Sequence, residues 1–394
     1  MNFLLTPDQE ILRDTLGEVL GKECTPDKIR NLYESSHFVD LELWGVLADM
    51  GLFGILVPEK SGGLGLGCLE LVLIMEQLGK FAFPGPIVEH LAGCIGYLTS
   101  MAETLPHLFG EFADQTLQNL LSGKMLASIA LEGSQPIAYG GSADLAMLVE
   151  SRAEPFLIEI SDDLQLIDID LVDRSYQLSQ VVNLSAADIQ TYTKATPLIT
   201  EPYCDLNPLD IELCDITRRI TFDRCSLCLS AQLLGLASWI LTSTVEYVKV
   251  RKQFGSPVGS YQAIKHHLAN ARLAIEFARP PLYYAAYNLE QFSSNLASRS
   301  KAGDNSTLLA SRSKAGDNFA LDYSAYERDV SFAKVYASRA AGLCAKLALQ
   351  SHGAIGYSWE HDLHMWMKRV WVLQNQWGTE DFHLDRVAQQ VCES

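Results

Sequence analysis

The side chains best suited to binding a ligand lie between Arg251 and Gln262, in the run Arg-Lys-Gln-Phe-Gly-Ser-Pro-Val-Gly-Ser-Tyr-Gln. A guanidinium binds phosphate oxygens in a fork geometry, so Arg251 suits a ligand that carries phosphate. Phe254 offers a flat apolar contact, and Gln262 offers a neutral hydrogen-bonding amide. The segment is therefore a candidate clamp for a phosphate-bearing molecule.

A second candidate segment runs from Gln350 to Tyr357 and reads Gln-Ser-His-Gly-Ala-Ile-Gly-Tyr. Its glycines, Gly353 and Gly356, would let backbone N–H groups approach a ligand closely. Each feature also has a simpler interpretation. An arginine at a helix end is usually a solvated cap, and Gly-x-x-Gly is usually a turn, so neither segment identifies a ligand by itself.

Composition and charge exclude two classes of partner. The chain has 394 residues, of which 48% are hydrophobic and 20% charged, and its formal net charge is -18. Nucleic acid requires a basic surface, and an anionic membrane surface repels an acidic protein. We therefore expect a globular protein of two or three domains with no nucleic-acid or membrane partner.

The N-terminus and the cysteines indicate the compartment. Thr6 and Pro7 read as a helix start, not as a cleavage site or a transit peptide. The nine cysteines have no disulfide-like spacing and are expected to be reduced, so we expect a cytoplasmic protein. The charge-free run from Cys225 to Val245 is long enough to span a bilayer, but its Ser, Thr and Gln residues favour a helix buried in a bundle.

Three short motifs carry little functional signal. Cys225-x-x-Cys228 lies in an apolar helix and not at the mouth of a βαβ unit, so redox activity is not expected. His361-x-x-His364 has no third ligand at a telling spacing, so we expect no metal site. The glycines of residues 61–67 do not make G-x-G-x-x-G and read as a surface loop.

The expected elements divide the chain into helical, β and helical parts. Residues 1–118 are predicted to form an N-terminal α-helical domain, with a capping box at Thr6 and helices that include 41–50 and 69–80. Residues 119–208 contain five or six short apolar runs separated by turn residues. They are predicted to form a middle β domain, a small antiparallel barrel or sandwich.

Residues 209–394 are predicted to form a C-terminal four-helix bundle, so the fold class is α+β and multidomain. Its four expected helices cover residues 225–252, 261–293, 324–351 and 378–390. A direct repeat, Leu296–Asn305 and Leu309–Asn318, interrupts the bundle. Its Ser, Gly, Asp and Asn content predicts an exposed, mobile loop without chemistry, because two copies cannot build a solenoid.

This order of parts resembles the acyl-CoA dehydrogenase fold, and the motifs sharpen the resemblance. Glu42-Leu-Trp44, Gly51–Pro58 and Gly62–Gly65 are similar to the family's N-terminal pattern. The segment from Arg251 to Gln262 resembles its most specific signature, and Gln350–Tyr357 resembles its later glycine motif. The resemblance implies FAD-dependent α,β-dehydrogenation of an acyl-CoA thioester, with electron-transferring flavoprotein as the acceptor.

The resemblance also implies a role for both candidate segments, because in this family the diphosphate clamp of one subunit grips the FAD of its neighbour. It places these residues at the cofactor: Arg251, Phe254, Gln262, Gln350, Gly353 and Gly356. The family's β domain contacts the flavin ring through a Thr-Glu-x-x-x-Gly-Ser-Asp-like turn and a Trp-Ile-Thr-like strand. Here the region reads Ala130–Ser134 and Gly140–Asp144, with no Trp between Trp44 and Trp239, so the ring-binding half is expected to be shortened or lost.

The family's catalytic base is missing from both positions where the resemblance would place it. The usual carboxylate position reads Trp377, and the alternative position reads Cys225. Neither side chain can take a proton as a carboxylate does. Glu380 and Asp381 lie nearby in the chain, but they would need a local rearrangement to substitute.

The chain thus retains what a subunit gives to its neighbour and lacks what it needs for its own site. It resembles the non-catalytic subunit of the two-plus-two acyl-CoA dehydrogenases of actinobacteria that act on steroid side chains, which implies a role in lipid metabolism beside a catalytic partner. Two alternatives stay open. One is a self-sufficient homo-oligomeric dehydrogenase that uses Glu380 or Asp381, and the other is a flavin-free structural or CoA-binding protein.

Overall fold

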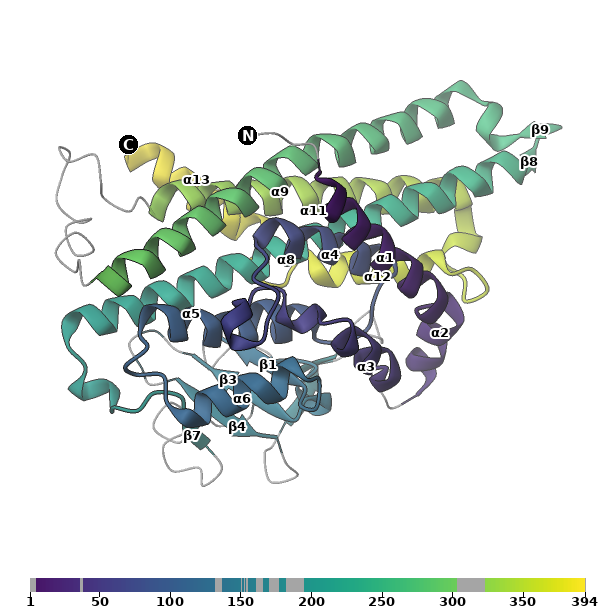
Figure 1. Ribbon diagram of the computed structural model, residues 1–394. Helices are drawn as coiled ribbons and strands as arrows, with labels where there is room; N and C mark the ends of the chain where they lie inside the picture. The colour runs from purple at the N-terminus through teal and green to yellow at the C-terminus, as the bar shows by residue number, and fades with distance from the viewer. Residues whose placement is uncertain are drawn as a thin grey trace.

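The computed structural model consists of helices and a smaller set of strands in the order helical, β, helical (Figure 1). It describes residues 5–35, 38–131, 137–149, 151, 153, 155–160, 166–169, 177–181, 195–302 and 323–393. The predicted fold class is confirmed by this order. The second copy of the direct repeat, and the end of the first, lie outside the described residues. The start of the first copy, which was predicted to be loop, continues the helix α9 to Ala302.

The N-terminal part is built from helices that pack around one apolar core. These are α1 (Pro7–Glu23), α2 (Pro26–Glu34), α3 (Leu41–Asp49), η1 (Leu52–Gly54), η2 (Glu59–Ser61), α4 (Cys68–Lys80), η3 (Val88–Ile95), α5 (Gly96–Thr104) and α6 (Glu111–Leu121). The predicted capping box is present, because Gln9 N donates to Thr6 Oγ1 and Thr6 N donates to Gln9 Oε1. The segment η3 is a π-helix that was not predicted.

The described residues of the middle part form two small sheets. A four-stranded sheet has the order β1 (Ala127–Ala130), β3 (Leu145–Leu148), β4 (Phe156–Glu159), β7 (Ala195–Pro197), and a three-stranded sheet has the order β2 (Ile137–Ala138), β6 (Leu178–Val181), β5 (Leu166–Ile169). The expectation of purely antiparallel pairing was wrong, because β1 and β3 run parallel. The chain leaves β1, contributes β2 to the other sheet and returns in the same direction, so the two strands cannot form a hairpin.

The C-terminal part is dominated by long helices. They are α8 (Pro208–Val250), α9 (Gln262–Ala302), α11 (Tyr323–His352), α12 (Leu363–Leu373) and α13 (Glu380–Glu393), with the short turns η5 (Tyr203–Asp205), η6 (Val258–Ser260) and η8 (Gly353–Tyr357). The helix α12 was not predicted, and α8 begins 17 residues before the predicted Cys225. Trp366 of α12 stacks on Trp239 of α8 with ring centroids 3.8 Å apart. A further helix, α12, thus packs against α8 and α11 of the predicted bundle.

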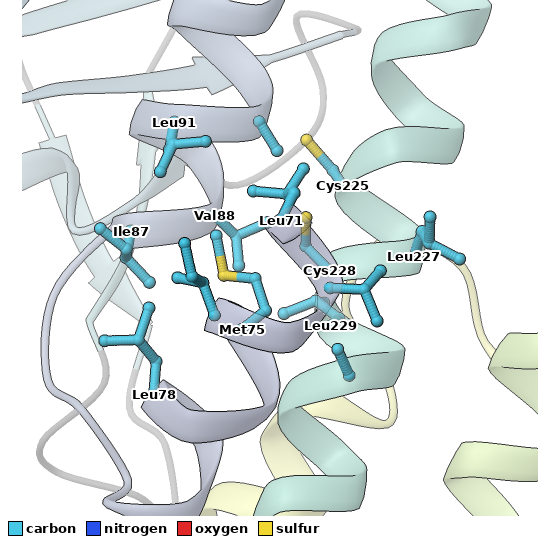
Figure 2. Packing of buried hydrophobic residues seen from close by; sticks show 14 of the residues in the cluster. Leu71, Met75, Leu78, Ile87, Val88, Leu91, Cys225, Leu227, Cys228 and Leu229 are labelled. Carbon is cyan, nitrogen blue, oxygen red and sulfur yellow. The ribbon is translucent and has the colours of Figure 1, made fainter. Parts of the chain in front are cut away.

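The apolar helix α8 lies where it was expected, inside the bundle (Figure 1). By length and composition alone it could cross a membrane, and it is the one helix of the described chain that could. Its most apolar window is 83% buried, which is typical of the core helix of a globular protein. Figure 2 shows Cys228 and Leu229 of α8 beside apolar side chains of α4 and η3, with Leu227 on the opposite side of α8.

A buried histidine joins the helical part to the first strand. His90 of η3 is fully buried, its Nε2 lies 3.2 Å from Leu120 O, and its Nδ1 accepts the N–H of Ala127 at 3.1 Å. Because Nδ1 is an acceptor here, Nε2 carries the proton and the ring is neutral. Burial is the main cause that lowers the pKa of His90 to about 4, from the ordinary histidine value of 6.5.

The lowered pKa of His90 predicts a loss of stability in acid. Between pH 6.5 and about 4 the unfolded chain binds more protons than the folded chain. The contribution of His90 to the free energy of unfolding is therefore fully present above pH 6.5 and is lost as the pH falls. The loss amounts to about 3 kcal/mol. Urea unfolding of wild type and His90→Gln across this range checks it. The variant should show the shallower pH dependence, and equal slopes would contradict the assignment.

Candidate functional site

The predicted clamp lies at the tip of two long helices. The helix α8 ends at Val250 with Arg251 as its C-cap, a two-stranded hairpin of β8 (Lys252–Gln253) and β9 (Ser256–Pro257) follows, and α9 begins at Gln262. Figure 1 shows this hairpin projecting from the joined ends of α8 and α9, away from the sheets of the middle part. A projecting hairpin is placed to contact another molecule and not the core of its own chain.

The tip of the hairpin is strained and exposed. Phe254 and Gly255 both have left-handed backbone, with φ of 51° and 81°. Two successive residues at positive φ are what a tight two-residue hairpin requires, and the first is usually Asn, Asp or Gly. A bulky Phe254 in this conformation, 95% exposed, costs stability and gains no burial within the chain. Its place at the tip therefore favours a contact outside the chain.

The polar side chains of the clamp form no hydrogen bond or ion pair with other described residues. The backbone of Arg251 is fixed, because its N–H donates to Tyr247 O and its carbonyl accepts from Val258 N at 2.7 Å. Its guanidinium is exposed and makes neither an ion pair nor a hydrogen bond to another described residue, and the same holds for the amide of Gln262. A guanidinium with free donors, carried on a backbone position that these hydrogen bonds fix, fits a phosphate oxygen.

The structure brings the glycine segment next to the clamp. His352, at the end of α11, stacks on Tyr247, one turn before Arg251, with ring centroids 4.1 Å apart. Gly353 follows with φ of 68° and open space where a side chain would lie, and Gln350 is exposed. Gly356 differs, because a Cβ there would lie 2.8 Å from His352 Cβ and 3.2 Å from Leu363. Open space at Gly353 suits close ligand approach, whereas Gly356 has a packing role.

Trp377 occupies the position where the family resemblance would place a base. It lies in the turn between α12 and α13 with φ of 51°, and the next residue, Gly378, has φ of 93°. The indole Nε1 donates to Glu89 Oε1 at 3.0 Å. The ring packs edge-on against Phe222 of α8, with ring centroids 5.9 Å apart. An indole N–H is a donor only, so Trp377 cannot abstract a proton.

The turn that holds Trp377 is fixed by buried polar groups. Lys334 of α11 is fully buried, and its Nζ donates to Leu373 O at 2.9 Å and to Gln376 O at 2.8 Å. His383 Nε2 lies 3.0 Å from the carbonyl of Trp377. Burial lowers the pKa of Lys334 to about 7, and burial followed by the charge of Lys334 lowers the pKa of His383 to about 3. These groups determine where the indole points.

The alternative base position is equally unsuited to proton abstraction. Figure 2 shows Cys225 on the face of α8 that meets η3, and a Cβ at Gly93 of η3 would lie 3.7 Å from its Sγ. Burial raises the pKa of Cys225, and that of Cys228, well above the ordinary thiol value. Both thiols therefore stay protonated at neutral pH, which also argues against redox activity of the C-x-x-C.

The substitute carboxylates Glu380 and Asp381 stay on the surface. Glu380 accepts a hydrogen bond from Arg339 Nε at 2.8 Å, and Asp381 is exposed. Neither residue contacts Trp377 or Glu89 by a hydrogen bond in the described chain. Glu380 is therefore one member of a surface ion pair, and Asp381 is not buried.

Part of the predicted ring-binding region is structural, and the remainder lies outside the described residues. Asp144 accepts the backbone N–H of Leu126 at 2.8 Å, and Ser142 donates to Gln177 Oε1 at 3.1 Å. These bonds hold the start of β3 and the turn before it. Residues 132–134 are not among those described. For the histidine pair 361 and 364, the described residues contain no group of three ligands that could hold a metal ion.

Sequence reasoning missed Glu89, Lys334 and His383. Glu89 is 3% exposed and lies 288 residues before its partner Trp377, so no local pattern links the two. Lys334 lies in a helix where a lysine normally faces water. Of these three residues, His383 could have been found from the sequence, because it lies within one helical turn of the Trp-Gly-Thr segment that ends at Thr379.

Comparison with known proteins agrees with this fold. The solved ChsE4–ChsE5 complex of Mycobacterium tuberculosis contains a chain similar over the full length of both, with a TM-score of 0.74 and 20% identity. A Tcur3481–Tcur3483 steroid ACAD variant is similar over 98% of both chains, with a TM-score of 0.72 and 19% identity. Acyl-CoA dehydrogenase IpdE2 of M. tuberculosis is 25% identical over 93% of this chain and 92% of its own length.

The fold and the matching family models define a chain of the acyl-CoA dehydrogenase type. The family models of the acyl-CoA dehydrogenase N-terminal domain, at residues 6–101, and C-terminal domain, at residues 216–302 and 307–392, both match. The chain belongs to the acyl-CoA dehydrogenase family. Membership supports oxidoreductase chemistry on a CH–CH bond and FAD as the cofactor.

Proposed function

We propose that this chain is the non-catalytic subunit of a heteromeric acyl-CoA dehydrogenase and supplies the diphosphate clamp for FAD bound to a catalytic partner. The observation that carries the proposal is the contrast between the two halves of the site. The side chains of Arg251 and Phe254 are exposed without partners, whereas Trp377 stands where the family resemblance places the base and its indole donates to Glu89.

The described residues on the clamp side fit an FAD diphosphate. Arg251 would bind phosphate oxygens, and Gln262 and Gln350 would donate hydrogen bonds. The open backbone at Gly353 would admit close approach, and Phe254 would cover an apolar part of the cofactor. When bound, FAD accepts the hydride that an acyl-CoA loses from its β-carbon. This chain contributes binding and orientation, and its turn at Trp377 takes no proton.

The partner would be an acyl-CoA dehydrogenase subunit that carries the base. The similar solved structures name a two-component complex, ChsE4–ChsE5, and a two-component steroid ACAD, Tcur3481–Tcur3483. A steroid-derived acyl-CoA is the substrate class that these neighbours favour for the complex. Electron-transferring flavoprotein is the acceptor expected for the family.

A turnover assay tests the division of labour between subunits. Acyl-CoA dehydrogenation should be absent with this chain alone and present when it is co-purified with a subunit that carries the base. The alternative, a homo-oligomer that uses Glu380 or Asp381, requires activity from this chain alone that the double variant Glu380→Gln, Asp381→Asn abolishes. That pair of results would overturn the proposed role.

A further inference from the structure

Three aromatic rings from three elements of the C-terminal part meet beside the clamp. Tyr247 lies in the last turns of α8, His352 ends α11, and His361 precedes α12. The ring centroids of Tyr247 and His352 lie 4.1 Å apart, with the ring planes 19° from parallel. His361 packs edge-on against both rings, with its centroid 4.8 Å from that of His352 and 6.0 Å from that of Tyr247. The three rings therefore join α8, α11 and the segment before α12 at one point.

Each half of the clamp is attached to one ring of the Tyr247–His352 stack. The N–H of Arg251 donates to the carbonyl of Tyr247 at 2.9 Å, so the turn that carries Tyr247 also holds Arg251. Gly353 follows His352 directly, and its φ of 68° is a conformation that favours glycine. Arg251 and Gly353 are far apart in the sequence. The stack between their neighbours therefore sets the separation between the two halves.

The ring of His352 is buried although one of its nitrogens is unsatisfied. His352 is 6% exposed, and its Nδ1 lies 2.9 Å from the carbonyl of Ala348. A carbonyl oxygen only accepts, so Nδ1 carries the proton and Nε2 does not. Nε2 is buried and has no hydrogen-bond partner among the described residues, which destabilises the fold. The flat ring, and not its second nitrogen, therefore explains why this side chain lies against Tyr247.

The neighbours of His352 hold its ring in place and keep it neutral. A Cβ at Gly356 would lie 2.8 Å from the Cβ of His352, so the glycine leaves the space that this side chain needs. His361 Nδ1 accepts the N–H of Leu363 at 3.2 Å, which fixes the edge-on ring. Burial is the largest cause that lowers the pKa of His352, the hydrogen bond to Ala348 opposes it, and His361 lowers it further. At neutral pH the ring is uncharged, as a phenylalanine ring would be.

We propose that Tyr247 and His352 are positioning residues that set the separation between Arg251 and Gly353, and thereby the affinity of the clamp for the FAD diphosphate. This role rests on the proposed function of the clamp, since it assigns to the stack no contact with FAD. A site that is already held in its bound arrangement loses less entropy when the ligand binds. Loss of the stack should therefore weaken FAD binding, although every group that contacts the cofactor remains.

Flavin titration of the FAD-free complex of this chain with its catalytic partner tests the role of the stack. His352→Leu and Tyr247→Leu each remove one ring and should weaken FAD binding by about threefold to tenfold, as expected for one aromatic pair. His352→Phe and Tyr247→Phe keep the rings and should retain the wild-type affinity. Tyr247 is only partly buried, so its variants keep the test decisive if His352→Leu does not fold.

The double variant Tyr247→Leu, His352→Leu shows whether the two rings act as one unit. It should bind FAD no more weakly than either single leucine variant, because all three lack the same contact. Additive losses would show that the rings act separately and would overturn the proposal. The same holds if the leucine variants bind as tightly as wild type, or if the phenylalanine variants bind as weakly as the leucine variants.

A matched change elsewhere in the bundle separates positioning from general stability. Phe292 of α9 and Tyr326 of α11 form a similar ring pair, with centroids 4.5 Å apart, toward the end of α9 that is opposite the clamp. Phe292→Leu should lower the stability of the complex to urea but leave its FAD affinity unchanged. A loss of FAD affinity equal to that of His352→Leu would reduce the effect to a general loosening of the fold and overturn the proposal.

Arg251→Ala in the same titration distinguishes this role from the clamp on which it rests. If Arg251→Ala loses FAD and the leucine variants at Tyr247 and His352 do not, the clamp stands and the positioning role is wrong. If Arg251→Ala retains FAD, the proposed function is wrong and the positioning role falls with it. The expected result is a large loss for Arg251→Ala, a smaller loss for each leucine variant, and none for the phenylalanine variants.

Discussion

Arg251→Ala is expected to strip FAD from the complex of this chain with its catalytic partner while leaving both subunits folded and associated. The guanidinium is exposed and unpaired, so its removal leaves no buried donor or acceptor behind. Charge-assisted hydrogen bonds to phosphate contribute about 1.5–3 kcal/mol, which corresponds to a loss of about tenfold to more than one-hundredfold in FAD affinity. Flavin absorbance after gel filtration measures the loss.

The adjacent lysine provides the matched control for Arg251. Lys252 is exposed on the same hairpin, and its replacement by alanine removes the same charge without removing the fork of donors. Lys252→Ala should change FAD affinity by a few-fold at most. If both variants lose flavin equally, a general electrostatic effect would replace the specific clamp. If neither loses it, Arg251 does not contact the cofactor.

Arg386→Met is expected to destabilise the fold by about 3–5 kcal/mol, since it leaves a buried carboxylate without a partner. Arg386 of α13 donates to both oxygens of Asp223, at 2.7 and 3.1 Å, and Asp223 is fully buried in α8. Its guanidinium also lies over the rings of Phe222 and Phe382, at 5.6 and 5.8 Å. This pair holds α13, and with it His383 and the turn of Trp377, against α8. Urea unfolding measures the change.

Two comparison variants show whether burial of the Arg386 pair causes this effect. Arg339→Met breaks the exposed ion pair with Glu380, whose side chains are 59% and 38% exposed, and should change the unfolding free energy by less than about 1 kcal/mol. The double variant Asp223→Leu, Arg386→Met removes both charges and should recover most of the loss. A similar loss for Arg339→Met, or no recovery in the double variant, would contradict the account.

The helices with clear end signals were predictable from sequence, and those without were not. The Thr6 capping box marked α1, but Asn207 and Pro208, which form the cap and first position of α8, were assigned to the end of the middle β domain. The first turns of α8 are rich in charged residues, so the apolar pattern becomes visible only later. The helix α12 is largely buried and has no polar face to mark its period.

The two halves of the site differ in how much of each could be predicted from the sequence. The clamp is local, because Arg251 to Gln262 folds as one helix end, one hairpin and one helix start. The turn at Trp377 depends on groups far apart in the chain. Glu89 and Lys334 reach it only through the packing of η3 and α11, and a period or a motif carries no information about such contacts.

The most direct test of the proposed division of labour is the native mass and flavin content of this chain expressed alone and together with a subunit that carries the base. We predict no bound FAD for the chain alone, and a two-plus-two complex with FAD when both subunits are present. The FAD of that complex should depend on Arg251. A yellow homo-oligomer that holds one FAD per chain and oxidises acyl-CoA without a partner would contradict the account.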